Sequence, residues 1–111
     1  MVKQGTIIKI NFNPQSGHEQ AGYRPAVVIS NDIFNEKARL SIVCPIINTN
    51  NDFPLHVPLD TRTKTTGVIL CEHIKALDLN SRTYQVIENL PKDILQNVID
   101  IVYSEIEQIE D

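Results

Sequence analysis

The stretch SGHEQAGYRPAVVIS, residues 16–30, changes character halfway along its length. Its first half combines two glycines with an acid and a histidine, a composition typical of a loop. Its second half, PAVVIS, predicts a buried strand with Pro25 at the edge or first position of that strand. His18, Glu19, Tyr23 and Arg24 therefore lie within seven positions, directly before a rigid element.

The segments on either side extend a pattern of short strands. Residues 6–12 (TIIKINF), 40–46 (LSIVCPI) and 83–88 (TYQVIE) have the composition of strands. Residues 54–59 (PLHVPL) carry two prolines and predict an edge strand, and residues 68–77 (VILCEHIKAL) predict a long strand or a bent pair. Residues 31–37 predict one helical turn capped by Asn31 or Asp32, and the polar residues 60–67 predict a hairpin loop.

The hydrophobic period becomes helical at the C-terminal end. Pro91 suits the first turn of a helix, and apolar residues at helical spacing follow it: Leu95, Val98, Val102, Ile106 and Ile109. Further isoleucines widen this apolar surface, which suggests burial on two sides, one of them against a partner chain. We expect one domain over residues 1–111, mainly β, with a small barrel over roughly 1–90 and a C-terminal helix over roughly 91–109.

Composition narrows the class of protein. The 111 residues are 41% hydrophobic and 22% charged, as in ordinary soluble domains, and no run of about 18 apolar residues could span a membrane. The N-terminus runs directly into a strand pattern without the apolar segment of a signal peptide, which predicts a cytoplasmic protein. Cys44 and Cys71 lie in apolar runs as buried thiols, and the scattered cysteines and histidines predict no metal site and no cofactor.

The net charge of −4 is unevenly distributed. Residues 88–111 hold seven acids and one base, a formal charge of −6, whereas residues 1–87 carry +2. The body of the protein therefore permits a phosphate-binding surface despite the negative total.

The residues of the loop suit the cleavage of single-stranded RNA. This reaction needs a base for the 2′-hydroxyl proton, an acid for the leaving 5′-oxygen and positive charge beside the phosphorane. His18 and Glu19 can transfer protons, and Arg24 matches phosphate oxygens. Tyr23 either stacks on a base or packs within the fold. By residue type alone, a solvated surface loop is the more common explanation, because charged residues mostly lie exposed.

The segment INFNPQSGHEQAGYRPAVVIS, residues 10–30, closely resembles the N-terminal motif of the MazF/PemK toxins. The segments VCPI and TGVILCEHIKALD, and the leucine–proline start of the last helix, fit the same family. The resemblance implies a small SH3-like barrel that forms a homodimer and acts as the toxin of a type II toxin–antitoxin module. It further implies a metal-independent endoribonuclease (an mRNA interferase) that cuts single-stranded RNA at short sequences and is blocked by a cognate antitoxin. It also implies that Arg24, Glu19 and His18 take part in catalysis.

The sequence departs from the family pattern after the second buried strand. Ile47 stands where the family usually has threonine or serine, so either Thr49 or Asn48 reaches the site instead or the activity is lower. Leu70 stands where some members have arginine, whereas Glu72 keeps the negative charge of an aspartate.

The candidate site residues come from several segments of the chain. The candidate catalytic residues are Arg24, Glu19, His18 and Thr49. The candidate RNA-binding residues are Gln20, Tyr23, Pro25, Asn48, Arg62 and Lys64. A solvated turn explains Arg62 and Lys64 equally well, and His56 and His73 are interpreted as structural residues of strands.

Two other functions remain open at this point. One is a catalytically weakened barrel that binds RNA or an antitoxin, and Ile47 favours it. The other is a gyrase inhibitor like CcdB, which shares the barrel but acts through the end of its C-terminal helix, where a tryptophan is typical. The C-terminal segment of this chain ends QIED, and the chain has no tryptophan.

Overall fold

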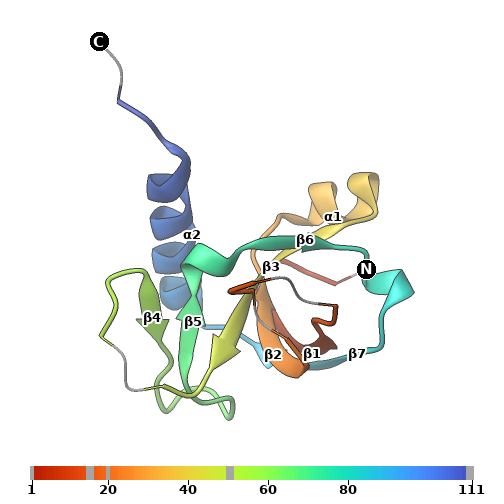
Figure 1. Cartoon of the computed structure of the whole chain (residues 1–111), viewed down its shortest axis with the longest axis horizontal. Helices are drawn as coiled ribbons and strands as arrows, with labels where there is room; N and C mark the ends of the chain where they lie inside the picture. Colours follow the sequence, from red (N-terminus) through yellow and green to blue (C-terminus); the bar gives the residue numbers. More distant parts are fainter. Residues whose placement is uncertain (1, 15–16, 20, 50–51, 110–111) are drawn as a thin grey trace.

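The computed structural model describes residues 2–14, 17–19, 21–49 and 52–109. Within them the chain forms short strands, two α-helices and two 3-10 turns (Figure 1). In chain order these are β1 (Thr6–Asn11), β2 (Tyr23–Val28), α1 (Asp32–Ala38), β3 (Ser41–Ile47), β4 (His56–Pro58), β5 (Val68–Leu70), η1 (Cys71–His73), β6 (Lys75–Leu77), η2 (Leu79–Ser81), β7 (Tyr84–Asn89) and α2 (Lys92–Ile106). The predicted fold class, mainly β with a C-terminal helix, is confirmed.

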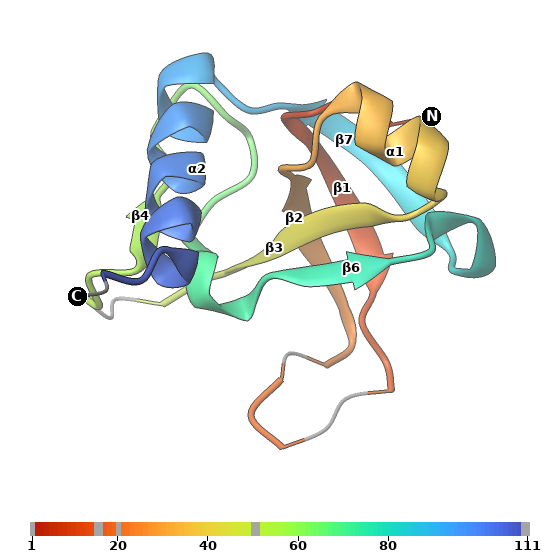
Figure 2. The same cartoon turned by 90° about the horizontal axis from the view of Figure 1, so that it is seen from above.

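The strands pair antiparallel in the order β4-β5-β3-β2-β1-β7, and β6 pairs with β3 as well. The sheet divides on β3, since Ser41, Ile42 and Val43 pair with β6 whereas Ile46 and Ile47 pair with β5. Seen from above, β4 lies beside α2 at one side of the molecule, and β1 and β7 lie at the other (Figure 2). β4 forms an edge of the sheet, as the two prolines of residues 54–59 predict.

Two prolines lie inside strands at points where a missing N–H is tolerated. Pro25 is the third residue of β2 rather than its first, and β3 joins β2 only from Ala26 onward. Pro45 lies between the part of β3 that pairs with β6, ending at Val43, and the part that pairs with β5, starting at Ile46. Each proline therefore lies beside a local gap in the pairing, which explains how a sheet interior accepts it.

The local elements follow the sequence pattern closely. Residues 68–77 form the bent alternative, with η1 turning the chain between β5 and β6. Asn31 caps α1, because its Oδ1 accepts a hydrogen bond of 2.8 Å from the backbone N–H of Phe34. Residues 60–67 connect the antiparallel strands β4 and β5, as predicted for a hairpin loop.

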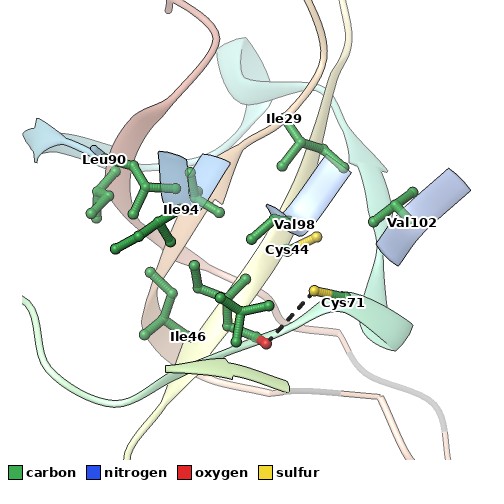
Figure 3. Close-up of a cluster of buried hydrophobic side chains, with 12 residues drawn as sticks. Ile29, Cys44, Ile46, Cys71, Leu90, Ile94, Val98 and Val102 are labelled. Carbon is green, nitrogen blue, oxygen red and sulfur yellow. Dashed lines mark hydrogen bonds between the residues drawn. The ribbon is translucent and has the colours of Figure 1, made fainter. Parts of the chain in front are cut away.

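α2 covers one face of the sheet. Its buried stripe consists of Ile94, Val98 and Val102, which pack against Ile29 and Cys44 of the β2–β3 region (Figure 3). The opposite face of β1, β2 and β3 buries a second cluster, because successive side chains of a strand point to opposite sides. Its members are Val2, Ile8, Ile10, Phe12, Ala26, Val28, Val43, Leu77 and Leu79.

The helix is shorter than predicted. Pro91 is its N-cap rather than its first residue, and the helix ends at Ile106 instead of near residue 109. Ile109 lies beyond it and is 92% exposed, while Ile106 is 67% exposed, so the apolar stripe does not continue to the end of the chain. Among the described residues, no helix is long and apolar enough to cross a membrane.

The hairpin loop is held against β7. The carboxylate of Glu88 accepts hydrogen bonds from the backbone N–H groups of Lys64 and Thr65 and from the Thr65 hydroxyl, at 3.1, 2.8 and 2.7 Å. Burial alone would raise the pKa of Glu88, but these hydrogen bonds outweigh it and hold the pKa below its usual value. The loop that carries Lys64 is therefore anchored by a charged acceptor.

Candidate functional site

The loop between β1 and β2 is fixed at its base. The backbone N–H of Phe12 donates to the carbonyl of Gly22 at 2.8 Å, and the N–H of Gly22 donates to Asn13 Oδ1 at 3.0 Å. Arg82 Nη1 donates to the carbonyl oxygens of Asn11 and Asn13, both at 2.9 Å. Gly22 has a φ of +82°, a left-handed conformation that suits glycine. The described residues of the loop extend away from the sheet from this base (Figure 2).

The loop closes one side of an open cavity of about 340 Å³. His18 and Glu19 reach it from the loop, and the cavity is completed by β3, η1 and β6. Its lining consists of Phe12, His18, Glu19, Pro45, Glu72, His73, Ile74 and Lys75. Glu19 Oε1 lies 3.1 Å from Lys75 Nζ, so an ion pair ties the acid of the loop to β6. The cavity therefore gathers two carboxylates, two imidazoles and one ammonium group.

Arg24 lies outside the cavity lining but on the same side of the sheet. Along β2 it shares a face with Ala26, and Ala26 pairs with Pro45, which lines the cavity. The Arg24 side chain is exposed, and its Nε donates to the carbonyl of Ala21 at 2.8 Å. This hydrogen bond orients the guanidinium and uses one of its N–H donors.

Other candidate residues lie in a second hollow of about 360 Å³. Pro25, Asn48 and Lys64 line it together with Lys9, Thr65, Thr66 and Ile87. Asn48 Oδ1 accepts a hydrogen bond of 3.0 Å from the Thr66 hydroxyl. Because Arg24 and Pro25 are successive residues of β2, strand alternation sends them to opposite faces. The catalytic candidates His18 and Glu19 line the first cavity, whereas the RNA-binding candidates Pro25, Asn48 and Lys64 line the second hollow.

Among the described residues, the candidates Tyr23 and Thr49 also line neither hollow. Tyr23 is exposed, with Lys9 Nζ 5.2 Å from the centre of its ring. Thr49 is half-buried just beyond the end of β3. Gln20 lies outside the described residues.

Arg62 is engaged in ion pairs rather than offered to a ligand. Its Nη1 and Nη2 each lie 3.0 Å from an oxygen of Asp93 at the start of α2, and Nη2 lies 2.8 Å from Asp60 Oδ2. The side-chain hydrogen bonds from Arg62 hold the pKa of Asp60 and of Asp93 below their usual values. Arg62 therefore ties the hairpin loop to the helix, which is a structural role.

Part of the cavity wall comes from residues that the sequence pattern did not indicate. His73 was interpreted as a structural strand residue, but it lies in η1 and lines the cavity beside Glu72. Lys75 was not singled out, yet it forms the ion pair with Glu19. The available signal was the cysteine, acid and histidine of residues 71–73 inside an apolar run. An acid and a histidine are unusual in a strand that is buried on both faces, so they indicate a break in the strand.

The two thiols are not nucleophiles of this site. Cys44 and Cys71 are free and buried in the core beneath α2 (Figure 3). Burial, followed by the nearby charges of Glu105 and Glu72, raises the pKa of Cys71 to about 12, and burial likewise raises the pKa of Cys44. A protonated, buried thiol acts as a small apolar residue.

The fold and the cavity together define a small, mainly β protein with acid–base groups and cations suited to phosphodiester chemistry. Residues 3–104 match the family of PemK-like, MazF-like toxins of type II toxin–antitoxin systems, and the chain belongs to this family.

Relatives support this assignment over most of the chain. Endoribonuclease PemK of Escherichia coli is 30% identical over 102 residues, covering 88% of this chain and 77% of PemK. Endoribonuclease EndoA of Bacillus subtilis is 32% identical over 103 residues, covering 88% of each chain. A crystal structure of MazF from Deinococcus radiodurans superposes with a TM-score of 0.89 at 33% identity, covering 95% of this chain and 96% of MazF. A MazE–MazF structure from the same organism gives a TM-score of 0.82 at 33% identity over 95% of both chains.

Proposed function

We propose that this endoribonuclease toxin cleaves single-stranded RNA in the cavity beneath the β1–β2 loop. The observation that carries the proposal is the grouping of two carboxylates, two imidazoles and Lys75 around one open cavity, with Arg24 on the same side of the sheet. The relatives are themselves endoribonucleases by name, which supports the same activity here.

The proposed reaction is an internal transfer at phosphorus. A base in the cavity, Glu19 or His18, takes the proton of the 2′-hydroxyl, and the 2′-oxygen forms a bond to phosphorus. The bond from phosphorus to the 5′-oxygen breaks, and the other member of this pair returns a proton to the leaving oxygen. The products are a 2′,3′-cyclic phosphate and a 5′-hydroxyl, and the electron pairs balance without an oxidant or reductant.

Arg24 stabilises the negative charge that develops on the phosphorane. Its guanidinium is oriented by the hydrogen bond to Ala21, so part of the ordering cost is met before RNA binds. The second hollow, with Lys9, Lys64 and Asn48, supplies cations and polar groups for flanking phosphates. Pro25 lines the second hollow, and Tyr23, two residues before it along β2, lies on the same side of the strand.

We further propose a homodimer in the cytoplasm that binds a cognate antitoxin protein. The exposed apolar flank of α2, with Tyr103 and Ile106 each about two-thirds exposed, supports a protein interface there. The free thiols Cys44 and Cys71 suit a reducing compartment. Light scattering at micromolar concentration should give twice the chain mass of 12.6 kDa, and a stable monomer would count against this assembly.

Cleavage of labelled RNA in EDTA, with mapping of both new ends, tests the activity. Cyclic phosphate ends at a short recurring sequence support the proposed function. Binding without cleavage would instead support the weakened barrel, for which the apolar Ile47 at the end of β3 is the favouring observation. Inhibition of gyrase without RNA cleavage would indicate the CcdB-like function.

A further inference from the structure

A buried histidine stands behind the cavity wall. The side chain of His56, on β4, is only 7% exposed, and its Nε2 lies 2.8 Å from Glu72 Oε2. Glu72 lines the cavity, whereas His56 does not. His73 approaches the same carboxylate oxygen with its Nε2 at 3.8 Å. The carboxylate thus has one close, buried partner and one more distant partner.

The surroundings of His56 determine which ring nitrogen carries the proton. A carboxylate only accepts hydrogen bonds, so the short contact requires an N–H at Nε2. Nδ1 is buried and has no hydrogen-bond partner among the described residues. A second proton on Nδ1 would be a buried donor without an acceptor, which is costly. The donor to Glu72 is therefore Nε2, and Nδ1 takes no part in holding the carboxylate.

The backbone fixes both members of this pair. His56 pairs with Leu70 across β4 and β5, and its ring meets the edge of Phe53 at 5.0 Å between ring centres. The N–H of Cys71, the residue before Glu72, donates to the carbonyl of Leu55 at 3.1 Å. The segments on either side of the contact are therefore tied to each other, and the side-chain geometry has little freedom.

A repulsive neighbour makes such a tether useful. Burial is the main cause that raises the pKa of Glu105 on α2, and the nearby charge of Glu72 raises this pKa further. This repulsion acts on Glu72 as well, and a mobile carboxylate would respond by moving its oxygens. The N–H of His56 opposes that movement from the β4 side.

We propose that His56 is a positioning residue that holds the Glu72 carboxylate at the cavity wall during RNA cleavage. The inference rests on the proposed function of this cavity and extends it to a residue that does not line the cavity. His56 touches no substrate; its effect passes through Glu72. Displacing a group of an active site by about 1 Å can cost on the order of 100-fold in rate, so the loss of this tether should be measurable.

Two amide substitutions test which ring nitrogen matters. The side-chain nitrogen of glutamine stands as many bonds from Cα as the Nε2 of histidine, whereas that of asparagine corresponds to Nδ1. His56→Gln should therefore keep most of the single-turnover rate, and His56→Asn and His56→Phe should lose roughly 10- to 100-fold with little change in RNA affinity. Equal rates for the Gln, Asn and Phe variants would overturn the proposal.

A double-variant comparison separates positioning from folding. If His56 acts only through Glu72, then His56→Phe should slow the parent but should not slow Glu72→Gln any further. If the rate losses of the two single variants multiply in the double variant, the proposal is overturned. Val57→Ala is the matched control for stability, because it shortens a buried side chain next to His56 on β4. This variant should lower the melting temperature without lowering the cleavage rate.

Imidazole ¹⁵N NMR tests the same contact without RNA. His56 should carry a proton on Nε2 in the parent, and its signals should move in Glu72→Gln. A neutral Nδ1–H form, or signals insensitive to Glu72→Gln, would overturn the proposal even if the parent cleaves RNA. If the parent does not cleave RNA, the proposed function fails, and the positioning role in cleavage falls with it. The NMR result would still show, independently of RNA cleavage, whether His56 donates a hydrogen bond to Glu72.

Discussion

Replacing Arg24 by alanine should separate activity from stability. Arg24 is exposed, and its Nε donates a hydrogen bond to the carbonyl of Ala21 at the surface. Surface substitutions of this kind usually change the free energy of unfolding by no more than about 0.5 kcal/mol. The loss of a preorganised donor beside a developing anion, by contrast, lowers the rate by about 10²–10³-fold, or roughly 3–4 kcal/mol in transition-state stabilisation.

The assay is single-turnover cleavage of an end-labelled RNA, paired with a thermal melt. Arg24→Lys should recover only part of the rate, because an ammonium group lacks the planar fork and cannot reproduce the Nε contact. Lys37→Ala, at the end of α1, removes one exposed positive charge elsewhere and should leave the rate unchanged. Cleavage by Arg24→Ala at the parental rate would remove this residue from the mechanism.

Three further outcomes are expected. Gly67→Ala should lower the melting temperature strongly, because at φ +117° the new Cβ would lie 2.2 Å from the carbonyl oxygen of Ile47, whereas Gly17→Ala meets no atom within 4 Å. Glu88→Ala should also lower the melting temperature at neutral pH. The pKa of Glu88 is depressed in the fold, so its stabilisation is present above the unfolded pKa of about 4.3, and the difference between parent and variant should vanish as the pH falls through the folded pKa. Ile47→Thr should raise the cleavage rate if the missing hydroxyl limits it; an unchanged rate, with a slower Thr49→Val, would assign that role to Thr49.

The strands and the helix could be predicted because local patterns determine them. Alternation, β-branching and flanking prolines placed every strand within a few residues, and Asn31 was one of the two caps predicted from residue type and position. The end of α2 was misplaced because Ile109 continues the apolar spacing, while spacing alone does not show where tertiary contacts stop. Burial of a helix depends on the sheet beneath it, which is a property of the whole fold.

The cavity could be predicted only on its loop side. His18 and Glu19 could be predicted because a charged loop flanked by glycines, directly before a buried strand, is visible in the sequence itself. Lys75 did not, because its partner Glu19 is distant in the chain and the two meet only when β6 pairs with β3. Arg62 shows the converse: its residue type suggested phosphate binding or a solvated turn, and only the fold brings Asp93 to it. Long-range pairing decides both cases.

The position of Ile47 gives its departure from the family pattern a specific physical meaning. Along β3, Ile47 follows Pro45 at alternate spacing, so it lies on the side of the strand that lines the cavity, whereas Asn48 lines the second hollow and is held there by the Thr66 hydroxyl. Asn48 is thus turned away from the place that a hydroxyl at position 47 would serve. An apolar side chain at that place leaves charge stabilisation to Arg24 and the groups already in the cavity. Activity in this chain should therefore depend more steeply on Arg24 than in a relative that carries threonine there, and Ile47→Thr should reduce that dependence.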